Sequence, residues 1–123
     1  MTLQRLEAEL TRETTRIHKD VIGKGPSNTS VKIFENIVII KLEDALSTFE
    51  SSVLVVQEGE ERIKELRTKL IDEYSHKLVE LIARYEECTL LDTLSAVHVS
   101  KEEVYVFLIL DDDLESCLKQ KSI

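Results

Sequence analysis

The first part of the chain carries apolar residues at helical spacing, with charged side chains between them. The apolar stripe consists of Leu3, Leu6, Leu10, Ile17 and Val21. Because positions three or four apart share one face of a helix, this pattern predicts an amphipathic helix over about residues 2–22. Gly23 would end that helix, and Pro26 would keep it from restarting.

Two strands are predicted next. Residues 29–34 alternate in character, and residues 37–42 are rich in β-branched side chains, which is typical of strands. Glu35 and Asn36 stand between them as a two-residue turn, and Asn tolerates the left-handed backbone that such a turn requires. We therefore expect a β-hairpin.

Two helices are predicted in the middle of the chain. Ser47 and Glu50 have the spacing of a capping box, so a short helix should begin there, run to about Val56 and end at Gly59. A longer helix should cover about residues 60–87. Its expected apolar face consists of Ile63, Leu66, Leu70, Tyr74, Leu78, Leu81, Ile82 and Tyr85.

Residues 90–97 and 104–110 predict two further strands, joined by a turn at residues 101–103. The last strand is apolar throughout, which is typical of a strand covered on both faces, and the second cover would be the first helix or another subunit. The order α-β-β-α-α-β-β predicts an α+β fold. We expect one mainly antiparallel four-stranded sheet with helices packed on one face. This single domain would span residues 1–113, with a C-terminal tail or short helix over residues 114–123.

Charge and composition exclude several classes of partner and location. The chain has 123 residues and a formal net charge of −8, from 24 acidic and 16 basic residues. An acidic surface cannot replace the counterions of phosphates, so we expect neither nucleic acid nor anionic lipid as a partner. No apolar run approaches the roughly 20 residues of a membrane span, and the first residues do not resemble a signal peptide. A cytoplasmic protein without direct membrane insertion is expected, with Cys88 and Cys117 as free thiols.

The loop Gly23-Lys24-Gly25-Pro26 is the leading candidate for a ligand site. Two glycines allow backbone amides to converge on an anion, and Lys24 would add positive charge. Since the loop must reverse the chain, Gly25 is expected to have a positive φ or a close backbone neighbour. The alternative is a purely structural helix stop followed by a turn. The candidate anion- or ligand-binding residues are His18, Lys19, Gly23, Lys24, Gly25 and His98.

Neither a metal site nor a catalytic site is predicted. His18, His76 and His98 are scattered along the chain without the spacing of a ligand pair, so no metal and no cofactor is expected. His76 should lie in solvent, and His18 could meet His98 only if the first helix packed across the end of the third strand. The chain has no nucleophile elbow and no triad spacing, so we predict that it is not an enzyme.

Several segments resemble the MpsC-like family of bacterial proteins. The most specific is Ile17-His18-Lys19 followed by the loop at residues 23–26. The others lie at residues 38–43, 46–50, 95–98 and 104–107, so that the resemblance covers roughly residues 12–110. The family name implies association with a bacterial system that translocates cations, generates membrane potential and is connected to inorganic-carbon uptake.

The resemblance implies a soluble accessory or regulatory protein, because a chain without a span cannot itself be the conduit. We expect it to act by protein–protein contact, as a homodimer and with a membrane transport protein as a further partner. The alternative is a small-molecule or anion-binding sensor, or a minor enzyme, that uses the loop at residues 23–26. A single cleft lined by His18, Lys24 and His98 would favour the sensor, and separate placement of these residues would favour the accessory protein.

Overall fold

The computed structural model describes residues 1–121, which form four α-helices, four strands and one short 3₁₀ turn. In chain order they are α1 (Leu3–Ile22), β1 (Asn28–Phe34), β2 (Ile37–Glu43), α2 (Thr48–Val53), α3 (Gly59–Ala83), β3 (Leu90–His98), η1 (Val99–Lys101), β4 (Glu103–Leu110) and α4 (Leu114–Lys121). The expected α+β class and element order are confirmed.

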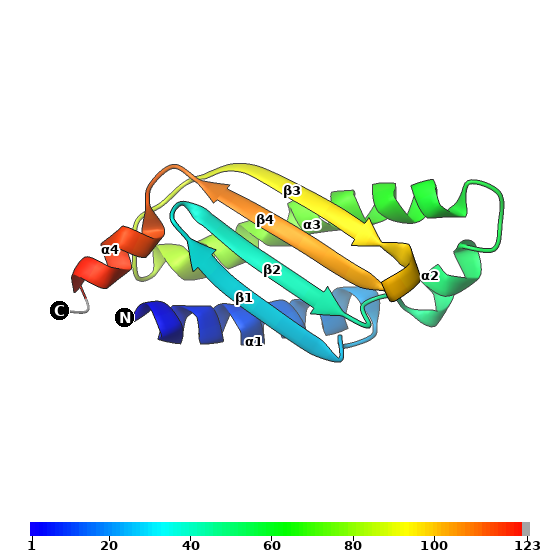
Figure 1. The fold of residues 1–123 in the computed structure, drawn as a ribbon, viewed down its shortest axis with the longest axis horizontal. Coiled ribbons are helices and arrows are strands. Elements are labelled where there is room, and N and C mark those ends of the chain that lie inside the picture. Colours follow the sequence, from blue (N-terminus) through cyan, green and yellow to red (C-terminus); the bar gives the residue numbers. More distant parts are fainter. Residues whose placement is uncertain (122–123) are drawn as a thin grey trace.

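The four strands form one sheet in the order β1-β2-β4-β3, and every neighbouring pair is antiparallel. Helices α1 and α3 both lie behind this sheet in Figure 1, so the helices cover one face. The register places Ile40 in β2 opposite Val31 in β1 and Val106 in β4. Because side chains alternate between faces, these three residues point together toward the helices.

The core lies between this covered face and the two long helices. Its strand residues include Val38, Ile40 and Leu42 of β2 and Val104, Val106 and Leu108 of β4, all of them buried. Leu6, Leu10 and Ile17 of α1 and Ile71, Leu78 and Ile82 of α3 pack against them. Leu114 and Leu118 of α4 complete the same cluster at one end of the sheet. Burial of this many aliphatic side chains is the main stabilising contribution to the fold.

The junction between α2 and α3 differs from the sequence prediction. Helix α2 ends at Val53 rather than near Val56, and Gly59 is the first residue of α3 rather than the end of α2. A Cβ atom on Gly59 would lie 2.0 Å from the backbone oxygen of Val53, so only glycine fits where the two segments cross.

The buried face of α3 is also rotated from the one predicted. Arg67 and Ile71 are fully buried, whereas Leu66 is 42% exposed. Tyr85, which is 37% exposed, lies beyond the end of the helix at Ala83. The leucines of the helix drew the predicted face toward Leu66 and Leu70, and the charge of Arg67 made its side of the helix resemble a solvated one. The true buried face runs through Ile63, Arg67, Ile71, Tyr74, Leu78 and Ile82.

Strand β4 is covered on only one of its two apolar faces. Its alternate side chains Tyr105, Phe107 and Ile109 point away from the helices, since their neighbours in the strand point toward them. Helix α1 packs on the same side as α3 and does not provide the second cover (Figure 1). Within residues 1–121, the outer face of the sheet therefore has no layer upon it.

Candidate functional site

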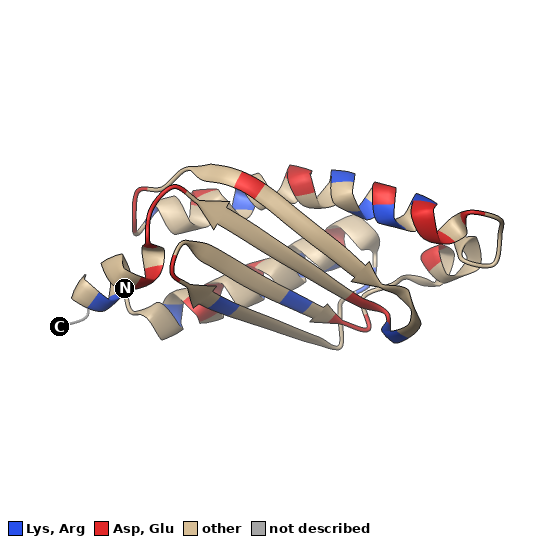
Figure 2. Cartoon of the chain, turned by 45° about the horizontal axis from the view of Figure 1, so that its top comes forward, with Lys and Arg blue, Asp and Glu red and all other residues tan. Residues whose placement is uncertain are grey.

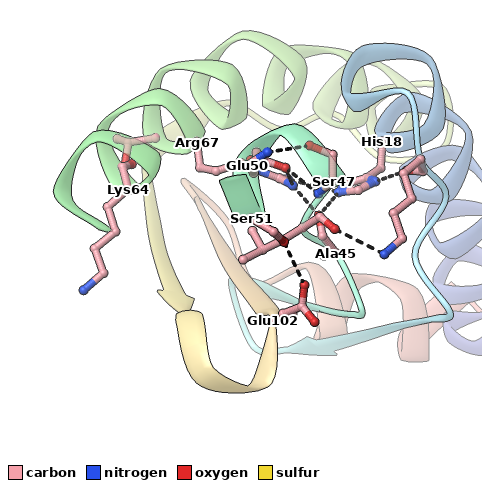
Figure 3. Close-up of polar contacts among 11 residues, drawn as sticks. His18, Ala45, Ser47, Glu50, Ser51, Lys64, Arg67 and Glu102 are labelled. Carbon is pink, nitrogen blue, oxygen red and sulfur yellow. Dashed lines mark hydrogen bonds and ion pairs between the residues drawn. The ribbon is translucent and has the colours of Figure 1, made fainter. Parts of the chain in front are cut away.

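Three helices bring ionisable side chains together in the interior. His18 near the end of α1, Glu50 in α2 and Arg67 in α3 are 1%, 3% and 0% exposed. Figure 3 shows them converging on the segment that holds Ala45 and Ser47. We call His18, Glu50 and Arg67 the buried clamp, because charged groups rarely leave water unless they are paired in this way.

The guanidinium of Arg67 is the centre of the buried clamp. Its Nε donates to Glu50 Oε2 at 2.5 Å and its Nη2 donates to Glu50 Oε1 at 2.7 Å, which is a bidentate ion pair. Its Nη2 also donates to the backbone oxygen of Ala45. Its Nη1 lies 3.0 Å from His18 Nε2. One buried side chain thus connects all three helices.

Glu50 is fixed by the helix that carries it. The predicted capping box is present: Ser47 Oγ accepts a hydrogen bond from the Glu50 amide, and Glu50 Oε1 accepts one from the Ser47 amide at 2.9 Å. Burial opposes ionisation, but the hydrogen bonds from Arg67 and from the Ser47 amide outweigh it and lower the pKa of Glu50. Glu50 is therefore an ionised partner for the arginine.

The partners of His18 define its tautomer. His18 Nε2 lies 3.0 Å from Arg67 Nη1 and 3.1 Å from the backbone oxygen of Ala45. Arg67 can only donate, so Nε2 accepts from Nη1, the ring proton lies on Nδ1, and Nε2 has no proton to give the Ala45 oxygen. Nδ1 then donates to the backbone oxygen of Lys24 at 2.6 Å. Burial, and next the neighbouring Arg67 charge, lower the pKa of His18. The ring is neutral and ties the end of α1 to the loop that follows it.

Two buried hydroxyl groups lie on the facing helices α1 and α3. Thr14 Oγ1 and Tyr74 Oη are both inaccessible and have no partner of normal hydrogen-bond geometry among residues 1–121. Burial raises the pKa of Tyr74 to about 12, against the opposing effect of the Arg67 guanidinium. Tyr74 is therefore a neutral phenol and not a base.

The glycine loop is organised differently from the prediction. Gly23 has a φ of +86° and donates its amide to the Lys19 oxygen, so it is the residue that ends α1. Gly25 does not have a positive φ, and a Cβ atom there would meet nothing within 4 Å. The prediction for Gly25 was wrong because the reversal takes place at the helix cap, two residues earlier.

Lys24 is engaged with neighbouring oxygens. Its Nζ donates to Asp44 Oδ1 at 2.8 Å and to the backbone oxygen of Leu46 at 3.2 Å. The Asp44 carboxylate would compete with an incoming anion for this ammonium group. Lys19, also among the predicted ligand residues, is exposed on the last turn of α1.

The structure brings His18 and Lys24 together but places His98 elsewhere. His98, at the end of β3, is exposed and lies beside Glu60 and Lys64 along a shallow hollow. His76 is exposed on α3, and Cys88 and Cys117 are unpaired thiols. In the part of the chain that the structure describes, no three His, Cys, Asp or Glu residues are grouped so that they could hold a metal ion.

Neither Glu50 nor Arg67 was predicted from the sequence as a member of this cluster. The capping box named Glu50 only as a helix start. For Arg67, the available signal was its helical phase, because it stands four residues after Ile63 and four before Ile71. The hydrogen bonds of the buried clamp are made within the protein, so that the clamp ties three helices together.

Comparison with known proteins identifies the family. The family described as "Na+-translocating membrane potential-generating system (MpsC)" matches residues 2–112, which is most of the chain. The chain belongs to the MpsC family. The resemblance seen in the sequence is confirmed, although the family description concerns a system and does not assign a task to this protein.

One curated relative of this MpsC family protein is the "Uncharacterized protein YbcI" of Bacillus subtilis (strain 168). It is 27% identical over 79 residues, which is 64% of this chain and 64% of the relative. No solved structure gives a significant match. Within residues 1–121, no helix combines the length and apolar character needed to cross a bilayer.

Proposed function

We propose that this MpsC family protein is a non-catalytic accessory or regulatory component of a membrane system that translocates cations and is connected to inorganic-carbon uptake. The observation that carries the proposal is a contrast between buried polar groups and exposed apolar side chains. The buried clamp uses its polar groups internally, whereas large apolar side chains stand in solvent. Exposed apolar clusters are typical of surfaces that bind other proteins. The protein would act through contact, in the cytoplasm, with a membrane transport protein of that system.

One exposed apolar cluster lies directly over the buried clamp. Val21, Phe49, Leu66 and Leu70 line a hollow of about 160 Å³, with Glu50 and Ser47 along its wall. Phe49 is 72% exposed on α2, next to the clamp glutamate. This hollow, which we call the α2 hollow, suits an apolar anchor on a cytoplasmic segment of the transport protein. Because α2 is only six residues long, binding there would act directly on the clamp.

The proposal is tested in the bacterium that encodes the chain. Deletion of the gene should lower the membrane potential measured with a fluorescent dye in sodium medium, and the wild-type gene should restore it. Phe49→Glu should fail to restore it, because a carboxylate replaces the apolar anchor. Val55→Glu is the matched control, since Val55 is 86% exposed but does not line the α2 hollow.

A photo-crosslinking amino acid at position 49 gives a direct second readout. It should capture a membrane protein of the cation-translocating system, and the same group at position 55 should not. An unchanged membrane potential in the deletion strain, together with no membrane-protein adduct at position 49, would contradict the proposal.

The alternative is an anion-binding sensor at the loop of residues 23–26. It is favoured only by the Lys24 side chain, which is 36% exposed. Calorimetric titration with inorganic phosphate separates the two functions. Saturable binding that is lost in Lys24→Gln would support the sensor, and its absence would leave the accessory function.

A further inference from the structure

The outer face of the sheet carries apolar side chains that no element within residues 1–121 covers (Figure 1). The cross-strand register puts Phe34, Ile37 and Ile109 in one row and Ile39, Phe107 and Leu94 in the next. We call these six residues the open sheet face. Phe34 is 54% exposed and Leu94 is 51% exposed, at its two edges. In Figure 2 the charges on the strands are few and isolated, whereas acidic and basic residues crowd the helices. Lys41, Glu43 and Glu103 lie further along the same outer face, where Lys41 forms ion pairs with both carboxylates.

The open sheet face is large enough for a reversible interface. Two adjacent rows across four strands, with strands about 4.8 Å apart and rows about 6.6 Å apart, give a flat patch of roughly 19 by 13 Å. That exceeds a scattering of single exposed side chains and approaches the largest apolar patches of monomers, about 300–600 Å². Stable interfaces bury about 800 Å² per partner, which this patch reaches only together with the polar positions around it, so we expect a reversible rather than a permanent association.

Charge at the rim indicates which partner fits. Lys32 lies on the β1 edge in the row of Ile39, and Asp92 lies on the β3 edge in the row of Ile109. Neither forms an ion pair within residues 1–121. The basic charge is thus on one edge and the acidic charge on the other. A two-fold axis parallel to the strands would place each edge over the opposite edge of an identical face.

We propose that the open sheet face binds a second copy of this chain, sheet against sheet, with β1 of one protomer over β3 of its partner. Apolar rows then meet apolar rows about 10 Å apart, as in aligned sheet packing. Lys32 of each protomer approaches the partner's Asp92, so the interface has two equivalent ion pairs. This second layer is also the missing cover for β4. The inference does not depend on the cation-translocating system.

Sedimentation velocity over the micromolar range tests the association. The wild-type chain should show a reversible monomer–dimer equilibrium. Phe107→Ser, at the centre of the face, should raise the dissociation constant tenfold or more. Its far-ultraviolet circular dichroism should stay unchanged, because Phe107 is not part of the buried core. A wild-type chain that remains monomeric at 100 µM would overturn the proposal.

Exchange of the charges at Lys32 and Asp92 tests the β1-over-β3 orientation. Both residues are exposed, so the variants should fold. Lys32→Glu alone and Asp92→Lys alone should each weaken self-association several-fold, because like charges then meet at both ends. The double variant should restore it. A mixture of the two single variants should form a heterodimer more tightly than either forms a homodimer.

Lys69→Glu is the matched control, since it makes the same charge change on the exposed surface of α3. It should associate like the wild type. If the single variants behaved like this control, or if the mixture gained no heterodimer, the β1-over-β3 arrangement would be wrong.

Discussion

The two faces of the sheet are formed by the same strands but differ in what covers them. Val106 and Phe107 are neighbours in β4, yet Val106 is buried beneath the helices while Phe107 points from the open sheet face. The helices cover the apolar residues on one face, and no element within residues 1–121 covers those on the other (Figure 1). Alternation alone would allow polar residues at the outer positions. The apolar character of these outer positions is therefore the feature on which the proposed self-association rests.

Ion pairs differ in the same way between the buried side and the solvent-exposed side of the molecule. The Arg67–Glu50 pair is buried and bidentate, while the Lys64–Glu60 pair lies on the solvent side of α3 with both side chains about half exposed. Water screens most of the attraction between two exposed charges. Removing one member of a buried pair instead leaves the other charge in the interior without a partner. The covered side should therefore be sensitive to single changes and the exposed side tolerant of them.

The largest effect is expected at the centre of the buried clamp. Arg67→Met keeps much of the side-chain volume but leaves Glu50 without its partner, so unfolding free energy should fall by about 3–5 kcal/mol. Urea denaturation measures the change. Lys64→Met, the control on the same helix, should shift unfolding free energy by no more than about 0.5 kcal/mol. Equal losses in the two variants would show that the clamp is not a stabilising element.

The next largest effect is expected from acid, which should lower the free energy of unfolding through the buried groups His18 and Glu50. The buried His18 ring stays neutral below the ordinary pKa of 6.5, whereas the unfolded chain takes up a proton there. Stability should therefore fall as pH falls below about 6.5, by at most about 1.4 kcal/mol per pH unit for one proton. Glu50, whose pKa is lowered from 4.5, adds a further loss as pH falls through that range.

His18→Asn separates these two contributions, because the amide can still donate to the Lys24 oxygen but does not titrate. Thermal unfolding from pH 8 to pH 4 should lose the part of the decline that begins near 6.5 and keep the part at lower pH. His76→Asn, on the exposed surface of α3, should follow the wild-type curve. A His18→Asn variant with the wild-type pH profile would contradict the neutral buried ring.

A smaller difference is expected between the two glycines of the loop. Gly23→Ala places a side chain at a φ of +86°, which should lower unfolding free energy by about 1 kcal/mol. Gly25→Ala meets open space at an ordinary φ and should be neutral or slightly stabilising. Chemical denaturation of the two variants side by side measures this contrast, and the reverse ranking would contradict the assignment of Gly23 as the helix cap.

The elements of the fold could be predicted from the sequence because each depends on local spacing. The stripe of α1, the β1–β2 hairpin and the Ser47–Glu50 capping box are all encoded within a few residues. Boundaries were less accurate where a tertiary contact decides them. Gly59 begins α3 because the backbone of Val53 crosses it, and a contact of this kind has no local signature.

The buried clamp could not be predicted because it depends on three helices meeting. Arg67 is charged, and a charged helical position indicates solvent unless a partner for it is known. Its partner Glu50 lies 17 residues earlier in a helix whose orientation the sequence does not give. The uniform apolar character of β4 was recognised, but the sequence could not decide whether a helix or another subunit covers its second face.

The most direct test of the account compares two adjacent residues of β4. Leu108 is fully buried on the covered face, and Ile109 belongs to the open sheet face. Leu108→Ala should lower unfolding free energy of the dilute monomer by about 2–5 kcal/mol and leave the association constant of the folded chain unchanged. Ile109→Ala should cost the monomer less than about 1 kcal/mol and weaken self-association in sedimentation velocity. If Ile109→Ala destabilised the monomer as much as Leu108→Ala, or left sedimentation unchanged, the division between a folding face and an association face would be refuted.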